Sequence, residues 1–440
     1  MGSMKPLALL GLLLGGVLVL SACFQAPPPP PPQGGCTPRA SGKALSAQGH
    51  DLLGLQGLGD FSSPYALGEL LVLFGGVAPQ ALLAQVEGIQ PLGKVGSSFF
   101  RVRTRVGQER ATAQALLRAG ARWVQPNYIY RPLALPNDPH YEDRQKSLLN
   151  GLVGLEAAWN ASTGDPSLIL AVVDTGYLPH EDMAGRWYLP PGETLDLADG
   201  DADPLDDIPL PAGRGHGLAV ASILGAATNN AKGMAGVTWG GRILPLKAAR
   251  SEDGEMLTSY VAQAVDKAVA LGAKVINLSL GGPASDPVLE SALVQARSQG
   301  VVLVAAAGNG GGEGLLYPAS SPSTLAVGSV NASRQKSRFS NCGPELDLVA
   351  PGEGVWGASD QDGYVLWSGT SMAAPVVSGI AALYLSQYWE LRGQWPTPDQ
   401  VRLCLTATAQ DLGPPGRDTG YGFGLVRADR VMANTTLCFP

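Results

Sequence analysis

The segment "LWSGTSMAAPVVSGIAALYL", residues Leu366 to Leu385, predicts a buried helix with polar residues in its first turn. Eight of its last ten residues are Ala, Val, Ile, Leu or Tyr, which is typical of a helix inside a core. A helix that begins near Ser371 would hold Pro375 in its first turn, where a missing N–H costs little. Ser371 would then lie at the positive end of the helix dipole, either as an N-cap or as a nucleophile.

The composition is that of a large, turn-rich chain. It has 440 residues, of which 45% are hydrophobic, and this suffices for a large core and for more than one domain. The formal net charge is −7 and the sequence contains no long basic run, so nucleic acid is not an expected partner.

The N-terminus has the pattern of an export signal. Lys5 precedes the apolar run "PLALLGLLLGGVLVL", and "LSAC" ends at Cys23. The ending resembles a bacterial lipobox, in which Cys23 becomes the lipidated first residue; an ordinary signal peptide or a membrane anchor with a chance Cys is the alternative. Pro27 to Pro32 would form a stiff tether behind it. We therefore expect a protein outside the cytoplasm, anchored to a bacterial membrane through this lipid or released after maturation.

Residues 68–132 have the pattern of a small separate domain. "ELLVLF", "GKVGSSFFRVRT" and "ARWVQPNYIYR" have strand character, whereas "APQALLAQVEG" and "ATAQALLRAG" have helix character. The β-α-β-β-α-β order is typical of a ferredoxin-like α+β domain. The polar stretch "PLALPNDPHYEDRQ" that follows is broken by prolines and predicts an exposed linker.

From about Leu149 onward, apolar strands alternate with helices. "SLILAVVD", "GRILPLKAA", "AKVINLSL", "VVLVAAAG" and "TLAVGSV" are continuous apolar runs of strand length, as expected for strands covered on both faces. "LTSYVAQAVDKAVALG" and "DPVLESALVQARSQG" lie between them with helical character. The alternation predicts an α/β fold with a doubly wound, mostly parallel sheet, whose sites lie beyond the carboxyl ends of the strands.

Three polar residues have positions that suit such a site. Asp174 directly follows an apolar strand, and Asn309 follows another between glycines. His216 stands between two glycines at the start of a helix of small residues, whereas His140 falls in a predicted linker and His180 in a predicted exposed loop. Taken singly, each has an ordinary structural explanation as a turn, cap or packing residue.

The order of these residues along the chain distinguishes among classes of serine hydrolase. Asp174, His216 and Ser371 follow the subtilisin order of Asp, His and Ser. An α/β-hydrolase places its histidine after the serine, and no histidine follows Ser371. The chymotrypsin order would need an aspartate between His216 and Ser371, and none there ends an apolar strand.

The chain thus resembles the subtilisin family of serine peptidases, through "AVVDTG", "GHG", "AAAGNG" and "SGTSMAAP", and further through "INLSLGG", "YPAS", "LDLVAPG" and "TGYGFGLVRAD". The resemblance implies that His216 takes the proton of Ser371, that Asp174 orients the imidazole, and that an acyl-enzyme forms on Ser371. It implies that Asn309 donates to the oxyanion. The preceding unit resembles the family's inhibitor-like propeptide, most clearly at "VQPNYIYRP".

The resemblance also implies where a peptide substrate binds. Ser279, Leu280 and Gly281 would pair with the substrate backbone as an added strand. Together with Ala306, Ala307 and Gly308 they would line the pocket for the residue before the cut bond. Because these side chains are small, we expect an open apolar pocket that prefers large apolar or aromatic residues. The family's Thr-His after the catalytic histidine is replaced by Leu218-Ala219, which removes a hydroxyl and an imidazole near the site.

No cofactor is expected for the chemistry, but structural calcium is plausible. "ATNNAKGMAGV" resembles the family's calcium loop, with Asn230 as a ligand and Asp182 as the partner carboxylate. The acidic stretch Asp196 to Asp207 lacks the spacing of an EF-hand and is expected to be a solvated loop.

Four cysteines besides Cys23 could pair in three ways outside the cytoplasm. They are Cys36, Cys342, Cys404 and Cys438; a Cys404–Cys438 clip on the C-terminal tail is favoured.

The resulting hypothesis is a secreted, lipid-anchored serine endopeptidase made as a self-processing proenzyme. Its predicted segments are a lipoprotein signal (1–22), a tether (23–67), an inhibitor-like propeptide (68–132), a peptidase domain (133–433) and a tail (434–440). Its expected partners are peptide or protein substrates, its own propeptide and a membrane. The alternative is a catalytically silent subtilisin fold that acts as a surface binding protein. A serine–carboxyl peptidase would need carboxylates in place of His216 and Asn309.

Overall fold

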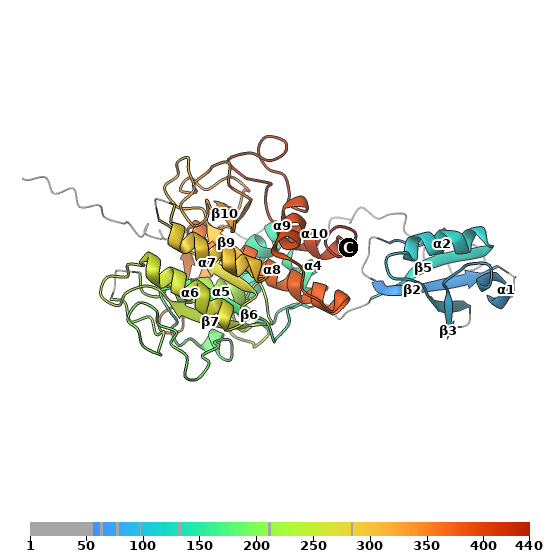
Figure 1. Cartoon of the computed structure of the whole chain (residues 1–440), viewed down its shortest axis with the longest axis horizontal. Helices are drawn as coiled ribbons and strands as arrows, with labels where there is room; N and C mark the ends of the chain where they lie inside the picture. Colours follow the sequence, from blue (N-terminus) through green and yellow to red (C-terminus); the bar gives the residue numbers. More distant parts are fainter. Residues whose placement is uncertain are drawn as a thin grey trace, which may run out of the picture.

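The computed structural model describes residues 56–61, 65–75, 79–96, 98–129, 134–209, 213–282 and 285–440. The predicted signal, Cys23, the proline run, Cys36 and His50 lie outside these residues. The described chain forms two units, each with its own hydrophobic core (Figure 1).

The small unit has the predicted ferredoxin-like topology. Its sheet has the strand order β1-β5-β2-β4-β3, in which β2 pairs antiparallel with β4 and β5, and β3 pairs antiparallel with β4. A two-residue strand, β1, adds to the edge in parallel with β5. The elements are β1 (Gly57–Leu58), β2 (Tyr65–Phe74), α1 (Pro79–Leu83), β3 (Gln90–Val95), β4 (Phe99–Arg103), α2 (Glu109–Arg118) and β5 (Ala121–Tyr128).

Both helices of the small unit contribute buried side chains to its core. Leu82 and Leu116 pack with Leu70 and Val102 from the sheet. Helix α1 is shorter than the run "APQALLAQVEG" predicts, because the chain leaves the helix through tighter turns before Gly88, whose φ is +77°.

The large unit is built on a parallel sheet of strand order β11-β10-β9-β8-β6-β7, which confirms the predicted α/β class. Its elements are η2 (Tyr141–Gln145), α3 (Lys146–Leu148), η3 (Leu149–Val153), α4 (Leu155–Trp159), β6 (Ile169–Asp174), η4 (Glu181–Met183), α5 (His216–Gly225), β7 (Arg242–Lys247), α6 (Thr258–Ala270), β8 (Val275–Leu278), α7 (Pro287–Ser298), β9 (Val302–Ala306), β10 (Leu325–Val330), β11 (Leu348–Pro351), β12 (Val355–Ser359), β13 (Gly363–Trp367), α8 (Thr370–Arg392), α9 (Pro398–Ala407) and α10 (Ala428–Ala433).

The helices around this sheet explain why its central strands are mostly apolar. Helix α6 packs beside α7, whereas α5 packs beside α8, and α8 runs along β8, β9 and β10. Every residue of β6, β8, β9 and β10 is buried, as expected for parallel strands covered on both faces. Strand β6 lies between β7 and β8, so the strand order reverses beside it, and the carboxyl ends of β6 and β8 are where a site is expected.

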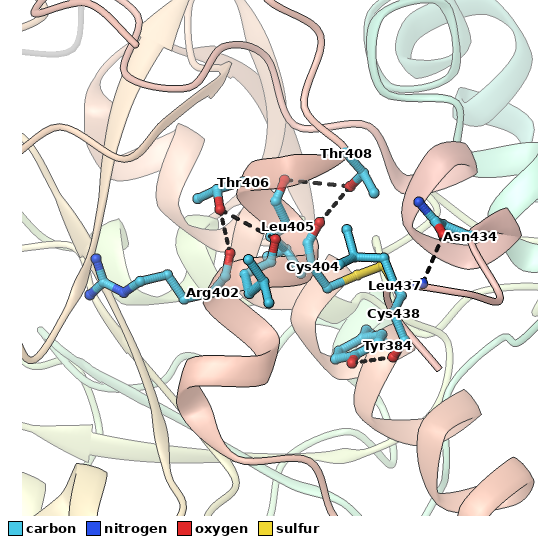
Figure 2. Close-up of a disulfide and its surroundings, with 10 residues drawn as sticks. Tyr384, Arg402, Cys404, Leu405, Thr406, Thr408, Asn434, Leu437 and Cys438 are labelled. Atoms are coloured by element: carbon cyan, nitrogen blue, oxygen red, sulfur yellow. Dashed lines mark hydrogen bonds between the residues drawn. A yellow bond between two sulfur atoms is a disulfide. The ribbon is translucent and has the colours of Figure 1, made fainter. Parts of the chain in front are cut away.

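A disulfide joins the C-terminal tail to α9, and a hydrogen bond joins the tail to α8. Cys404 bonds to Cys438, which confirms the favoured pairing, while Cys342 carries a free thiol. Figure 2 shows Tyr384 of α8 donating its hydroxyl hydrogen to the carbonyl of Cys438 beside this bond. Phe439 is also buried, so the end of the chain belongs to the core.

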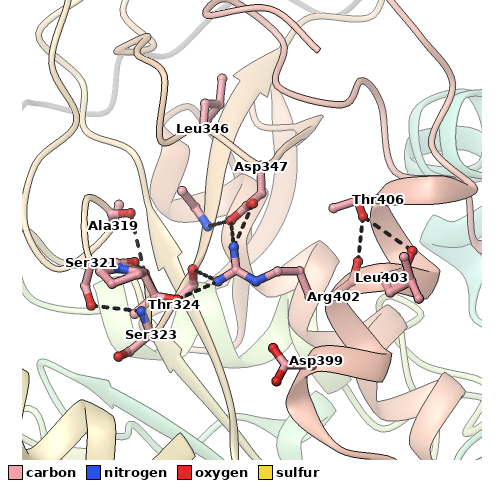
Figure 3. Close-up of polar contacts among 12 residues, drawn as sticks. Ala319, Ser321, Ser323, Thr324, Leu346, Asp347, Asp399, Arg402, Leu403 and Thr406 are labelled. Carbon is pink, nitrogen blue, oxygen red and sulfur yellow. Dashed lines mark hydrogen bonds and ion pairs between the residues drawn. The ribbon is translucent and has the colours of Figure 1, made fainter. Parts of the chain in front are cut away.

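An arginine fixes α9 to the edge of the sheet. Arg402 donates to both carboxylate oxygens of Asp347, each at 2.7 Å, and to the carbonyl of Thr324 (Figure 3). Asp347 is almost fully buried and also accepts the N–H of Ala326, so its charge is compensated from two elements.

Two expectations about exposure are wrong. The stretch predicted as an exposed linker packs onto the large unit: Asp138, Tyr141 and Gln145 are buried, and the amide of Gln145 exchanges hydrogen bonds with the backbone of Ala235. His180 is also buried, because its ring caps η4 by accepting the N–H of Asp182. In both cases polar side chains are buried because they satisfy backbone groups, which polarity alone does not reveal. None of the helices in the described ranges combines the length and apolarity needed to span a bilayer.

Candidate active site

Asp174 and His216 meet at the carboxyl end of β6. His216 Nδ1 lies 2.7 Å from Asp174 Oδ1, which also accepts the N–H of Thr175 at 2.8 Å. The Asp174 side chain is 1% exposed and that of His216 11%. With a proton on Nδ1, the Nε2 atom of His216 is left available as a base.

Close contacts between two glycine-containing segments bring this pair together. A Cβ on Gly217 would lie 2.3 Å from the carbonyl oxygen of Gly176, so the start of α5 can approach the end of β6 only without a side chain there. Thr175 Oγ1 accepts the N–H of Gly217 and donates to Asp206 Oδ2. Asp206 also accepts the N–H of Gly215.

The surroundings of His216 favour its protonated form. Burial is the largest single influence and favours the neutral ring, but the charge and hydrogen bond of Asp174, with the charge of Asp206, outweigh it. The pKa of His216 is therefore raised above its ordinary value of 6.5.

Helix α8 begins at Thr370, and this corrects the expected role of Pro375. With Gly369 as N-cap, Pro375 lies beyond the first turn, where its N–H would bond to the carbonyl of Ser371. That carbonyl instead accepts the hydroxyl of Ser279 at 2.8 Å. A side chain from the end of β8 thus replaces the hydrogen bond that the proline removes.

Ser279 is itself held by a buried network. Asn277 Nδ2 donates to Ser279 Oγ at 2.9 Å, and Ser378 of α8 donates to Asn277 Oδ1 at 2.8 Å. Asn277 and Ser378 are fully buried, so these hydrogen bonds have no competition from bulk water. The network fixes the first turn of α8 to the carboxyl end of β8.

The hydroxyl of Ser371 points to this same strand end. Ser371 Oγ donates to the carbonyl of Ser279 at 3.3 Å, and within the described ranges no hydrogen bond joins it to His216. Ser279 and Ser371 therefore exchange hydrogen bonds in both directions.

Asn309 is oriented by the residue before Ser371. Its Oδ1 accepts both the backbone N–H of Thr370 at 2.8 Å and the Thr370 hydroxyl at 3.0 Å. With Oδ1 occupied, the side chain presents Nδ2 as its donor, near Gly369 at the start of α8. The geometry is suited to a developing negative charge beside Ser371.

The two segments expected to line the substrate pocket lie side by side. Ser279, Leu280 and Gly281 follow β8, and Ala306, Ala307 and Gly308 end or follow β9, the next strand of the sheet. Leu218 and Ala219, which replace the family's Thr-His, are fully buried in α5. Trp367 of β13 places its ring near that of His216, with centroids 6.5 Å apart and the planes nearly perpendicular.

The two predicted calcium ligands are also adjacent. Asn230 Nδ2 donates to Asp182 Oδ1 at 3.1 Å, and Asp182 Oδ2 accepts the N–H of Met234. Burial raises the pKa of Asp182 to about 6. Asp138, which sequence reasoning missed, accepts the N–H groups of Asn229 and Asn230 on the same loop. In the described part of the chain, no three His, Cys, Asp or Glu side chains cluster as metal ligands.

The acidic stretch Asp196 to Asp207 is not merely a solvated loop. The fully buried ammonium of Lys247 lies 2.7 Å from Asp196 Oδ2 and also pairs with Asp199 and Asp207. Burial opposes the charge of Lys247, but the carboxylates outweigh it and raise its pKa. The positive charge at the centre of this loop is therefore the ammonium group of Lys247.

Sequence reasoning also missed Thr175, Asp206, Thr370, Asn277 and Ser378. Thr175 and Thr370 directly adjoin predicted site residues, which is a usable signal. Asp206 and Ser378 have no such signal, because their partners lie far away in the chain.

Together with the fold, this geometry defines a serine endopeptidase, a hydrolase of peptide bonds. The chain belongs to the subtilase family, whose model (Peptidase_S8) matches residues 165–424.

Characterised relatives agree with this assignment. The thermophilic serine proteinase of Bacillus sp. (strain AK1) is 35% identical over 369 residues, covering 81% of this chain and 86% of that protein. Thermitase of Thermoactinomyces vulgaris is 37% identical over 302 residues, covering 68% of this chain and 99% of thermitase. A solved protease structure from Pseudoalteromonas arctica has a TM-score of 0.60 at 30% identity, covering 68% of this chain and 99% of that one. Peptides or proteins are therefore the substrate class.

Replacing Ser279 by Ala should lower kcat about 10-fold while the fold is retained. The carbonyl of Ser371 would lose the hydrogen bond that replaces the missing helical one, a loss of about 1–1.5 kcal/mol. Steady-state kinetics on a peptide substrate, with circular dichroism for the fold, measures this. The matched control is Ser298→Ala on α7, whose hydroxyl donates to the carbonyl of Gln295 in the same helix. An unchanged kcat in Ser279→Ala would contradict the positioning role.

Proposed function

We propose that this protein is a secreted serine endopeptidase that uses Asp174, His216 and Ser371 as its catalytic triad and Asn309 as the oxyanion donor. The observation that carries the proposal is the 2.7 Å contact between His216 Nδ1 and Asp174 Oδ1, which leaves Nε2 as the base. The placement of Ser371 in the first turn of α8 supports its role as nucleophile, because the helix dipole favours a nearby negative charge.

Substrate binding supplies a reason for the direction of the Ser371 hydroxyl. A peptide that pairs with Ser279, Leu280 and Gly281 would donate an N–H to the carbonyl of Ser279. That carbonyl now accepts the Ser371 hydroxyl, so the substrate would displace it. The released hydroxyl would turn to His216 Nε2 and become activated only when a peptide is in place.

The chemical steps then follow from the arrangement. His216 takes the proton as Ser371 Oγ attacks the carbonyl carbon, and Asp174 stabilises the imidazolium. Asn309 Nδ2 and the backbone N–H of Ser371 hold the oxyanion. His216 protonates the departing amine, and a water molecule, deprotonated by His216, then hydrolyses the acyl-enzyme.

A fluorophosphonate probe should label the wild-type protein at Ser371, and Ser371→Ala should abolish the labelling. The probe reacts only with an activated serine, so it tests the chemistry without a known substrate. Labelling should fall as pH drops, because protonated His216 cannot accept the proton. Since the pKa of His216 is raised, the midpoint should lie above 6.5. Peptide mapping of the labelled protein identifies the site.

The control for this experiment is Ser368→Ala, next to the site in sequence, which should still be labelled. The competing hypothesis is a catalytically silent subtilisin fold that acts as a binding protein. The observation in its favour is that no hydrogen bond joins Ser371 to His216 in the described chain. Failure to label the folded wild type at any pH would establish that hypothesis instead.

We further propose that the small unit is an intramolecular inhibitor and folding aid that the enzyme removes itself. It has its own core, precedes the catalytic unit, and ends in β5 before residues that connect it to the peptidase. A tail leading on from β5 could enter the site as a substrate-like strand.

Ser371→Ala should therefore accumulate as an uncut precursor. Mass spectrometry should find it heavier than the wild type by about 7 kDa or more, the mass of some 65 residues at roughly 110 Da each. Equal masses with the junction intact would exclude self-processing, and equal masses with the junction cut would assign the cut to another peptidase.

Export and anchoring are proposed from the N-terminal sequence, which lies outside the described residues. If "LSAC" directs lipidation of Cys23, then Cys23→Ala should move the protein from the membrane fraction to the soluble fraction without loss of peptidase activity. Immunoblots of the two fractions measure this. A variant that stays in the pellet as firmly as the wild type would show that the anchor lies elsewhere.

We also propose a structural Ca²⁺ at the loop that carries Asn230. Two carboxylates, Asp182 and Asp138, face this loop, and the buried Asp182 lacks a basic partner at hydrogen-bond distance among the described residues. Asp182, the Asn230 amide oxygen and loop carbonyls would hold the ion, which would stabilise the loop and take no part in the chemistry.

EDTA should lower the Tm of the uncut Ser371→Ala protein by about 5 °C or more, and added Ca²⁺ should restore it, because an ion that binds only the folded state stabilises it. The variant prevents autolysis during the scan. The additional change Asp182→Asn should remove the calcium response. The same response in Asp182→Asn would place the ion elsewhere.

A further inference from the structure

A short segment after β9 runs between the two walls of the expected substrate pocket. Leu316 N–H donates to the carbonyl of Ala307 at 3.0 Å. The next residue, Tyr317, pairs with Gly282 through two hydrogen bonds of 2.7 and 2.9 Å. Leu316 and Tyr317 are thus held by both walls and close the end of the pocket.

The side chain of Leu316 occupies the space between these walls. A Cβ built on Gly308 would lie 2.7 Å from Leu316 Cγ and 3.0 Å from Cδ1. A Cβ built on Gly281 would lie 2.8 Å from Leu316 Cβ and 3.1 Å from Cδ1. The Cδ1 methyl group of Leu316 thus lies against both walls, and the leucine side chain fills the space beside Gly308 and Gly281.

The segment has little freedom to withdraw. Asn341 is buried and binds the preceding loop at three points: it donates to the carbonyls of Gly308 and Gly314 and accepts the N–H of Gly310. On the other side of Leu316, the buried Tyr317 donates its hydroxyl hydrogen to Glu290 of α7. Because the backbone is fixed on both sides, a large substrate side chain would have to displace Leu316 within a fixed frame.

We propose that Leu316 is the specificity-determining residue of this peptidase and restricts the position before the cut bond to small side chains such as Ala. The inference rests on the proposed function, since it concerns the same pocket. It replaces the expectation of an open pocket for large apolar or aromatic residues. That expectation rests on the small side chains of the two walls alone and does not include Leu316, which lies between them.

The test compares two chromogenic peptides, succinyl-Ala-Ala-Pro-Ala and succinyl-Ala-Ala-Pro-Phe p-nitroanilide. The wild-type enzyme should cleave the Ala peptide with a kcat/KM at least about 10-fold above that of the Phe peptide, because the Phe ring meets Leu316. In Leu316→Gly the Phe-to-Ala ratio of kcat/KM should rise by about 10- to 100-fold. Leu316→Ala should give a smaller rise and serves if the glycine variant does not fold.

The matched control is Leu315→Ala, since that side chain faces Gly343 on the other side of the segment. Its Phe-to-Ala ratio should equal that of the wild type. A wild-type enzyme that is labelled by the fluorophosphonate but prefers the Phe peptide overturns the role of Leu316 and leaves the peptidase function intact. A wild-type protein that neither cleaves a peptide nor is labelled overturns both.

Discussion

The hydrogen bond from the Ser279 hydroxyl to the carbonyl of Ser371 connects the sheet to the catalytic helix. Pro375 removes the N–H that would otherwise satisfy this carbonyl, so the first turn of α8 depends on a donor from outside the helix. The donor comes from the end of β8 and is fixed by Asn277 and Ser378. The position of Ser371 is thereby set by a strand of the parallel sheet, the same sheet that positions Asp174. The relative position of Ser371 and Asp174 is consequently as fixed as the sheet itself, which suits a reaction that requires a fixed geometry.

Glycine performs a similar function on the histidine side. Gly217 lets the start of α5 approach the carbonyl of Gly176, and Gly176 in turn lets the chain approach the carbonyl of Pro204, each more closely than a side chain would permit. The buried carboxylate of Asp206 binds the backbone at Gly215. The Asp–His pair thus depends on glycines, which have no side chain, whereas the first turn of α8 at Ser371 depends on the side chain of Ser279. The Ser371 turn leaves its buried polar groups hydrogen-bonded, which keeps the cost of burying them low, whereas Asp174 Oδ2 is buried without a hydrogen-bond partner among the described residues.

Much of this could be predicted from the sequence, because the informative signals are local. Apolar runs of strand length gave the parallel sheet, and Asp174 was located by the end of such a run. The errors arise where a partner distant in the chain decides the outcome. The polarity of Asp138 and His180 indicates exposure, yet both are buried because they satisfy backbone groups. The proline at 375 could be interpreted correctly only once Ser279 was seen beside it. The proposed narrowing of the pocket depends on Leu316 and Tyr317, and their sequence has no periodic pattern that would reveal their path.

The buried ammonium of Lys247 gives the acidic loop a property that a bound ion could not. The negative charge of its carboxylates Asp196, Asp199 and Asp207 is partly compensated by an ammonium that is covalently part of β7. A chelator cannot remove this charge, and dilution cannot deplete it. The loop also contains Asp206, which supports the backbone beside His216. The charge that holds this half of the site in place is therefore independent of the mineral content of the surroundings.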